Sequence, residues 1–138
     1  MKEAEMYVYY FGEGAILRAK TPGILPDHLG IAGRRRLHGV QEVIHSRPPF
    51  GVQVTTLEEF AKGRHVEAVC LPDSPEHGQE VLARAYSQIG RPWTLTGNCE
   101  HFASWAFSGG PDSPQLREYI AGACAFVLVA AVLTRNGR

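Results

Sequence analysis

The signals for strand and helix fall in separate halves of this chain, and that separation restricts the fold more than any other feature. Short apolar runs bounded by glycine and proline predict five strands, at residues 15–19, 28–32, 40–45, 52–56 and 65–70. The segment GRRRLHG (33–39) has a glycine at each end and predicts a polar loop that joins the second and third strands as a hairpin. The first half is therefore predicted to be an antiparallel sheet.

Helical signals begin in the second half. Ser74 and Pro75 suit the N-cap and the first position of a helix, and apolar residues, Ile89 among them, recur at helical spacing until Gly90. A second helix is predicted from near residue 98, and a third from about residue 113 into an apolar tail. Strands followed by helices are typical of an α+β domain, with an antiparallel sheet packed against helices.

Length and charge exclude several classes of protein. A chain of 138 residues is expected to form about one domain. Fourteen basic residues balance fourteen acidic ones, which argues against a partner such as nucleic acid. The three cysteines, Cys70, Cys99 and Cys124, are odd in number and lack the CxxC spacing, so neither a disulfide framework nor a cysteine-rich zinc site is expected.

The tail has an uncharged stretch of fifteen residues, from Tyr119 to Leu133. As a helix it would reach roughly 22 Å, short of the ~30 Å hydrocarbon core of a bilayer. It is either a buried core helix or a short membrane anchor with Arg135 and Arg138 near lipid headgroups. Acidic residues precede any apolar run at the N-terminus, unlike a signal peptide, so we expect a cytoplasmic protein that associates with membranes through this tail.

Cys99 is the candidate nucleophile. It falls in the first turn of a predicted helix, where unpaired N–H groups and the helix dipole favour a thiolate. A nucleophilic cysteine needs a base, and His28 and His45 lie on neighbouring predicted strands that place side chains on one face. One imidazole would contact the thiol, and the other would orient the ring of the first. The alternative is a small buried cysteine and two structural histidines.

Several segments resemble one family. Residues 98–102 read NCEHF, which resembles the signature of the lecithin:retinol acyltransferase-like family of the NlpC/P60 superfamily. HLGIAG (28–33) and VIH (43–45) resemble its two histidine motifs, and residues 84–110 resemble its helix, loop and catalytic helix. The apolar tail resembles the small phospholipase/acyltransferase branch, whose members end in a hydrophobic anchor.

The resemblance implies a permuted papain-like (NlpC/P60-type) fold, with a catalytic domain at 1–112 and a C-terminal apolar helix or membrane-associating tail at 113–138. It implies that Cys99 is the nucleophile, His28 the general base and His45 the residue that orients His28. The chemistry would be phospholipid acyl hydrolysis or acyl transfer through an S-acyl intermediate, with no cofactor and no metal. The partners would be a phospholipid or other acyl ester and a membrane surface.

Three alternatives stay open. The same fold is used by cysteine peptidases and amidases, and a catalytically silent, membrane-associated interaction module is a further reading. The hairpin is longer than the family's, which makes His38 a rival to His45 as the third residue. A metal site formed by Cys99, His101 and His28 is the remaining alternative.

Other side chains have a structural and a functional reading. Glu100 and His101 are expected on the helix surface, and Cys70 and Cys124 are expected to be inert. The arginines at 34–36 either bind lipid phosphate or are solvated, and Trp93 and Trp105 either line an acyl pocket or belong to the core. His65 and His77 have no partner at a metal-binding spacing.

Overall fold

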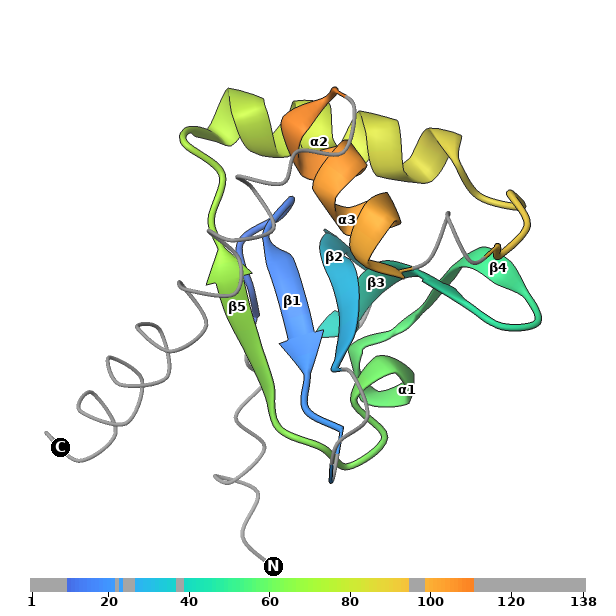
Figure 1. Cartoon of the computed structure of the whole chain (residues 1–138). Helices are drawn as coiled ribbons and strands as arrows, with labels where there is room; N and C mark the ends of the chain where they lie inside the picture. Colours follow the sequence, from blue (N-terminus) through green and yellow to red (C-terminus); the bar gives the residue numbers. More distant parts are fainter. Residues whose placement is uncertain (1–9, 22, 24–26, 37–38, 95–98, 111–138) are drawn as a thin grey trace, which may run out of the picture.

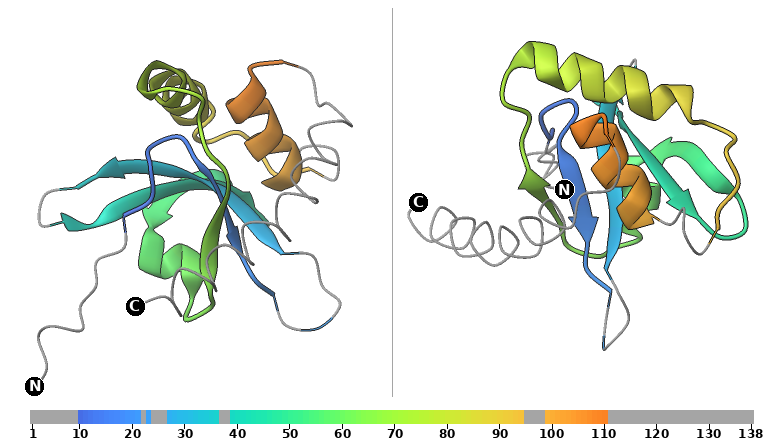
Figure 2. Two further views of the ribbon diagram at one scale, coloured as in Figure 1. Left: turned by 90° about the vertical axis from the view of Figure 1, so that its left-hand side faces the viewer. Right: turned by 45° about the horizontal axis from the view of Figure 1, so that its top comes forward.

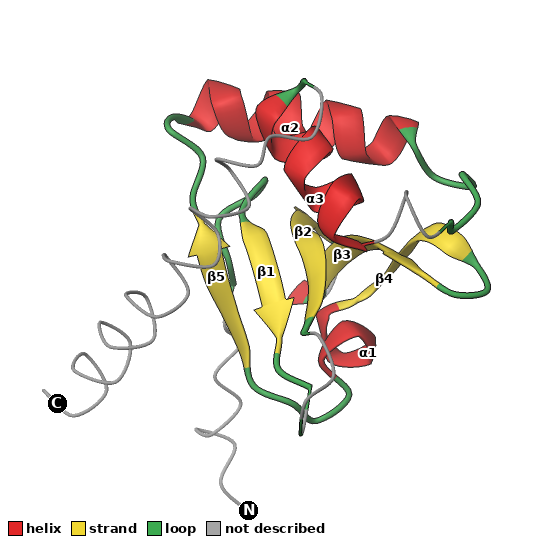
Figure 3. Ribbon diagram, in the orientation of Figure 1, coloured by secondary structure: helices red, strands yellow, loops and turns green. Residues whose placement is uncertain are grey.

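The computed structural model describes residues 10–21, 23, 27–36, 39–94 and 99–110. In this part of the chain five strands form one antiparallel sheet, in the order β4-β3-β2-β1-β5, and three helices accompany it (Figures 1 and 3). The elements are β1 (Ile16–Ala19), β2 (His28–Arg35), β3 (Gln41–Arg47), β4 (Gly51–Thr56), α1 (Leu57–Ala61), β5 (Val66–Cys70), α2 (Pro75–Ser87) and α3 (Cys99–Ser108). The predicted α+β architecture with an antiparallel sheet is confirmed.

The helices cover both faces of the sheet. Helices α2 and α3 lie over one face and α1 lies against the other, as the two views of Figure 2 show. Neighbouring residues of β1 serve the two sides, since Ile16 belongs to the core under α2 and α3 while Leu17 packs with Phe60 of α1. Alternation of side chains along a strand thus supplies two apolar layers from one short run.

Two features of the first half differ from the sequence predictions. Strand β2 extends to Arg35, so the first three residues of the predicted loop are strand, because Arg35 still pairs with Gln41 across the hairpin. Helix α1 was not predicted: it has five residues, too few to show a period. Its start is nonetheless encoded, since the Thr56 hydroxyl accepts the amide hydrogen of Glu59 as an N-cap.

Helix α2 begins as predicted and ends earlier. The Ser74 hydroxyl accepts the His77 amide hydrogen at 3.0 Å, and Pro75 is the first helical residue. The helix ends at Ser87, so Ile89 lies outside it and its side chain is 49% exposed. The reason is tertiary: the next residue, Gly90, donates its amide hydrogen to the Val52 carbonyl of β4 and draws the chain away from the helix axis.

Helix α3 begins at Cys99, close to its predicted start. The further helix expected from residue 113, the apolar tail, Cys124 and His38 lie outside the described residues. Among the residues that are described, no helix combines the length and the apolar character needed to cross a bilayer.

Candidate active site

Two histidines from adjacent strands form a hydrogen-bonded pair. His28 begins β2, His45 lies near the end of β3, and Nε2 of His28 is 2.7 Å from Nδ1 of His45. Both rings lie against Phe60 of α1, with centroid distances of 5.3 Å. His45 is buried and His28 is partly buried. The structure therefore brings together the two imidazoles that the sequence placed on neighbouring strands.

The backbone makes room for this pair. The ladder between β2 and β3 runs from Arg35 and Gln41 to Ile31 and Ile44, so both histidines lie beyond its end. Gly30 is the residue that allows the close packing. A Cβ there would lie 2.8 Å from a Val43 methyl, 2.9 Å from the Phe60 ring and 3.2 Å from the His45 Cβ.

A third side chain fixes the direction of the hydrogen bonds. The Thr55 hydroxyl lies 2.9 Å from Nε2 of His45 and donates its own proton to the Thr56 carbonyl at 3.3 Å. Its oxygen therefore accepts from Nε2–H of His45, which leaves Nδ1 of neutral His45 as an acceptor. His28 then donates from Nε2–H, and the lone pair of neutral His28 is at Nδ1. By this assignment His28 has its basic nitrogen away from the pair.

Both imidazoles are neutral at physiological pH. The pKa of His28 is lowered from 6.5 to about 4, mainly by burial and also by the positive charges of Arg47, Arg64 and Lys62. The pKa of His45 is lowered from 6.5 to about 3, mainly by burial and also by His28, Arg47 and Lys62. The neutral forms are those that the hydrogen-bond directions require.

Cys99 is the first residue of α3 and is partly buried against the core under the helices. Its sulfur interacts with the backbone N–H of Leu29, the residue that follows His28 on β2. Burial raises the pKa of the Cys99 thiol, and the Glu100 carboxylate raises it too, against the opposing effect of the backbone amides. The thiolate expected from the helix start is therefore wrong for the resting protein, because desolvation outweighs the amides.

The thiol and the imidazoles approach β2 from different sides. Helix α3 lies on the same face as α2, opposite α1 (Figure 2). His28 and His45 contact Phe60 of α1 and so project toward the other face. Among the described residues, the hydrogen bonds of the two rings go to each other and to Thr55, and none goes to Cys99. The link between the two groups is the His28–Leu29 step of the strand.

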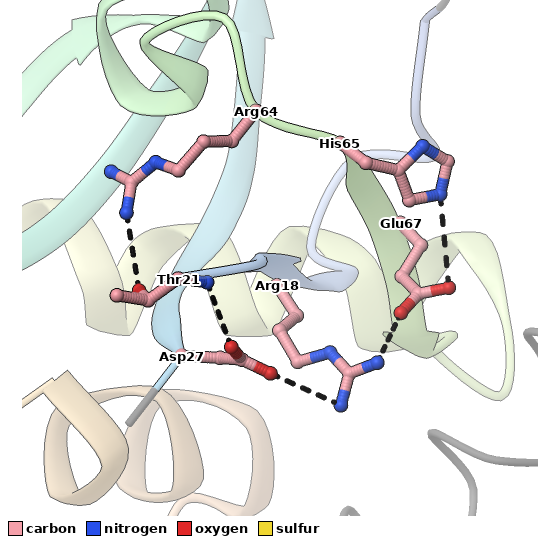
Figure 4. A network of polar contacts seen from close by, with 6 residues as sticks. All are labelled: Arg18, Thr21, Asp27, Arg64, His65 and Glu67. Atoms are coloured by element: carbon pink, nitrogen blue, oxygen red, sulfur yellow. Dashed lines mark hydrogen bonds and ion pairs between the residues drawn. The ribbon is translucent and has the colours of Figure 1, made fainter. Parts of the chain in front are cut away.

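A polar network precedes His28 and anchors the start of β2. Its members, drawn in Figure 4, are Arg18, Thr21, Asp27, Arg64, His65 and Glu67. Asp27 accepts the Thr21 amide hydrogen at 2.8 Å and lies 3.4 Å from the Arg18 guanidinium, which also binds Glu67. Asp27 is thus fixed directly before His28. No sequence motif predicted this network, although a charge inside each of two apolar runs, AILRA and HVEAVC, was an available signal.

The three arginines at the end of β2 have partners within the chain. Arg34 lies over the Tyr86 ring at 5.1 Å, Arg35 lies over the Tyr10 ring at 3.3 Å, and Arg36 forms an ion pair with Glu42 at 3.0 Å. All three are exposed, as the solvated alternative predicts, and each also contacts a neighbouring side chain on the protein surface. Binding of lipid phosphate by these arginines stays a prediction.

The remaining candidates have structural surroundings. Cys70 is buried in the core, and Trp105 packs against the same core. His65 is largely exposed with Glu67 4.0 Å away, and Nε2 of His77 is 3.0 Å from the Phe107 carbonyl. In the part of the chain that is described, no group of three or more His, Cys, Asp or Glu side chains could hold a metal ion. Cys99, His101 and His28 therefore do not form such a group.

Comparison with known proteins identifies the family. The family model described as lecithin retinol acyltransferase matches residues 24–112, a range that holds both histidines and Cys99. The lecithin retinol acyltransferase of Rattus norvegicus is 32% identical over 95 residues, which are 64% of this chain and 39% of that protein. The fold and the site define a class of protein: an α+β domain with a pair of histidines and a cysteine at the start of a helix. Within that class, this chain belongs to the lecithin retinol acyltransferase family.

The chain spans about two fifths of the length of that relative. The segment NCEHF at 98–102 and the histidines at 28 and 45 all fall within the range that the family model matches.

Proposed function

We propose that this protein is a thiol-dependent acyltransferase or acyl hydrolase that acts on phospholipid esters through an S-acyl-cysteine intermediate. The observation that carries the proposal is the placement of Cys99, at the start of α3, on the backbone of the residue that follows His28. Family membership supports an acyl-transfer activity. The permuted papain-like arrangement, with the histidine strands before the cysteine helix in the sequence, belongs to the same proposal.

The proton relay follows from the hydrogen-bond directions. Nδ1 of His28 takes the Cys99 proton, the sulfur attacks the ester carbonyl carbon, and His28 becomes an imidazolium whose Nε2–H still donates to His45. The C–O bond of the ester then breaks, and the leaving alkoxide takes the proton from His28. Water or an amine next attacks the thioester, loses a proton to His28, and releases the acyl group as the sulfur is reprotonated.

Before substrate binds, the thiol and the imidazole are both neutral and lie on different sides of β2. The proposal therefore requires Cys99 and His28 to come within hydrogen-bond reach, and the proton to move, as the substrate binds. The hydrogen bonds of a catalytic base are often long or absent before the substrate arrives. A lipid ester that excludes water from the site would strengthen the attraction between thiolate and imidazolium. His45 and Thr55 act as positioning residues, since they hold the ring of His28 and its tautomer.

Basic side chains favour a phosphate-bearing substrate. Arg47, Lys62 and Arg64 all act on His28 electrostatically, and none of the three has an ion-pair partner among the described residues. A phosphodiester beside the site would neutralise this charge, whereas a neutral peptide would not. This observation favours a phospholipid over the substrate of a peptidase or amidase.

The proposal extends to the chain's organisation. We assign residues 1–112 to the catalytic domain and residues 113–138 to an apolar helix or tail that associates with membranes. The second assignment rests on the fifteen uncharged residues from 119 to 133.

Mass spectrometry of the full chain tests the chemistry. After incubation with phosphatidylcholine, we expect one acyl group on the peptide that contains Cys99, released by hydroxylamine as a thioester is. Cys99→Ser should lose the hydroxylamine-labile adduct and turnover, and Cys70→Ser is the matched control that should keep both. His28→Ala should lose turnover while the fold survives. Full turnover in Cys99→Ser or in His28→Ala would overturn the assignment, and peptide cleavage without acyl transfer would favour the peptidase reading.

A further inference from the structure

Two exposed apolar segments meet where β4 begins. The tip between β3 and β4, Pro48–Phe50, is exposed, and the Phe50 side chain is 66% accessible. Ile89, just past α2, is 49% accessible. Val52 joins the two segments, since its N–H donates to the Arg91 carbonyl and its carbonyl accepts from the N–H of Gly90, both at 2.9 Å. Figure 1 shows the turn after α2 descending to the start of β4.

Close backbone contact holds these segments in place. A side chain at Gly51 would collide with the Arg91 carbonyl, and Gly51 has a φ of +75° that favours glycine. Phe50 and Ile89 are therefore presented by two segments whose backbones touch. Exposed apolar side chains gathered in this way indicate a binding surface rather than scattered exposure.

Basic residues flank both segments. Arg47 precedes the tip and Arg91 follows Ile89, and neither guanidinium has a carboxylate partner within the described residues. Arg91 is exposed, and among the described residues its guanidinium donates a hydrogen bond to the Gln88 side chain, at 2.7 Å. Apolar side chains that enter the headgroup region, beside guanidiniums that bind phosphate, are the combination that binds an anionic bilayer.

The other end of α2 provides a contrast. Leu71 is 65% exposed, almost as much as Phe50, but it lines an open hollow together with Glu13, Asp73 and Glu76. Helix α2 has 13 residues and so separates the two ends by roughly 20 Å. An anionic surface would be repelled by the acidic end and attracted by the basic end, so the charge selects which apolar side chain faces lipid.

We propose that Pro48, Pro49, Phe50 and Ile89, with Arg47 and Arg91, form a docking surface for an anionic lipid bilayer. The surface adjoins the candidate site in the chain, because His45 is two residues before Arg47 and the segment after Arg91 leads to Cys99. Docking there would bring the site to the lipid that carries its substrate. The inference rests on the proposed function for the nature of the partner, but lipid binding requires no reaction at Cys99.

Vesicle binding of the full chain tests the surface. We expect the chain to bind vesicles of phosphatidylserine and phosphatidylcholine, with weaker binding in high salt or on pure phosphatidylcholine. The double variant Phe50→Ser, Ile89→Ser should bind about tenfold more weakly, since it loses two apolar side chains from the headgroup region. Arg91→Gln should weaken binding about fivefold on the anionic vesicles alone. Leu71→Ser, with the same loss of an exposed apolar side chain, should bind as the parent does.

A second measurement reports position directly and is independent of any contribution from the tail. Phe50→Trp and Leu71→Trp place an indole at the two ends of α2. On vesicles that contain brominated phosphatidylcholine, Phe50→Trp should show quenching beyond that of the parent chain, and Leu71→Trp should show none beyond it. Equal extra quenching at the two positions, or none at residue 50, would overturn the proposal.

The outcomes separate this inference from the proposed function. Cys99→Ser should keep parent-like vesicle binding, while the double variant should keep turnover of a soluble short-chain ester. Loss of turnover in Cys99→Ser, together with unchanged vesicle binding of the double variant, would overturn the docking surface and leave the proposed function standing. Self-association of the chain that disappears in the double variant, without a change on vesicles, would assign the surface to a second copy instead.

Discussion

Nε2 of His28 lies 2.7 Å from Nδ1 of His45, and the rings are nearly perpendicular, with an interplanar angle of 81°. This one hydrogen bond determines which nitrogen of His28 is basic, because His45 already uses its other nitrogen on Thr55. The chemistry of the candidate site depends on that polarity.

Thr55 should act as a positioning residue. In Thr55→Val, His45 loses the acceptor for Nε2–H and can adopt the tautomer that donates toward His28, so we expect turnover to fall about tenfold or more. The pH profile of kcat should shift as well, because the pair then titrates with different partners. Thr55→Ser should restore both turnover and profile; a serine variant as poor as the valine variant would contradict the role.

The pH dependence of stability should carry the signature of two buried neutral histidines. The pKa of His28 is lowered from 6.5 to about 4 and that of His45 to about 3. Below pH 6.5 the unfolded chain therefore binds more protons at these histidines than the folded chain does. Stability from this source is fully present above pH 6.5 and is lost as the pH falls from there to about 4 for His28 and about 3 for His45.

Urea unfolding at several pH values checks this expectation. The double variant His28→Gln, His45→Gln should lose less stability between pH 7 and pH 5 than the parent chain does, since the carboxylates contribute equally to both. Parallel curves for the two proteins would show that the histidines are not buried as neutral groups.

Alkylation of Cys99 should be slow at neutral pH, and its rate should keep rising at pH values above the pKa of an ordinary thiol. The raised pKa of its thiol leaves little thiolate in the resting protein, so the rate with iodoacetamide should keep rising above pH 9.0, the ordinary value. Peptide mass spectrometry distinguishes Cys99 from the other two cysteines. A plateau reached near pH 7 would mean an ionised thiol in the free protein, against this prediction.

Arg84 should stabilise the helix that carries Cys99. Its Nε donates to the Ala106 carbonyl at 2.7 Å and its Nη2 to the Phe107 carbonyl at 3.1 Å, at the C-terminal end of α3. Arg84→Gln should lower the free energy of unfolding by about 1–3 kcal/mol, as for hydrogen bonds to a charged group. Arg91→Gln, an exposed site, is the matched control and should change it by less than about 0.5 kcal/mol. Equal effects would contradict the capping role.

Local signals in the sequence determined the elements and the candidates. Alternation and turn residues were sufficient for five strands, and Ser74 with Pro75 was sufficient for the start of α2, because caps and periodicity act over only a few residues. The same locality explains the errors. Strand β2 reaches Arg35 because Gln41 pairs with it from the next strand, and α2 stops before Ile89 because Val52 of β4 binds Gly90.

Only the tertiary structure decided the state of the site. The sequence placed Cys99 at a helix start and His28 and His45 on neighbouring strands, but a pKa depends on how far each group is removed from water and on which charges surround it. Burial reversed the expected ionisation of Cys99, and Thr55, which no motif singled out, fixed the tautomers. Packing brings such partners together from distant parts of the chain, so short-range patterns in the sequence do not contain them.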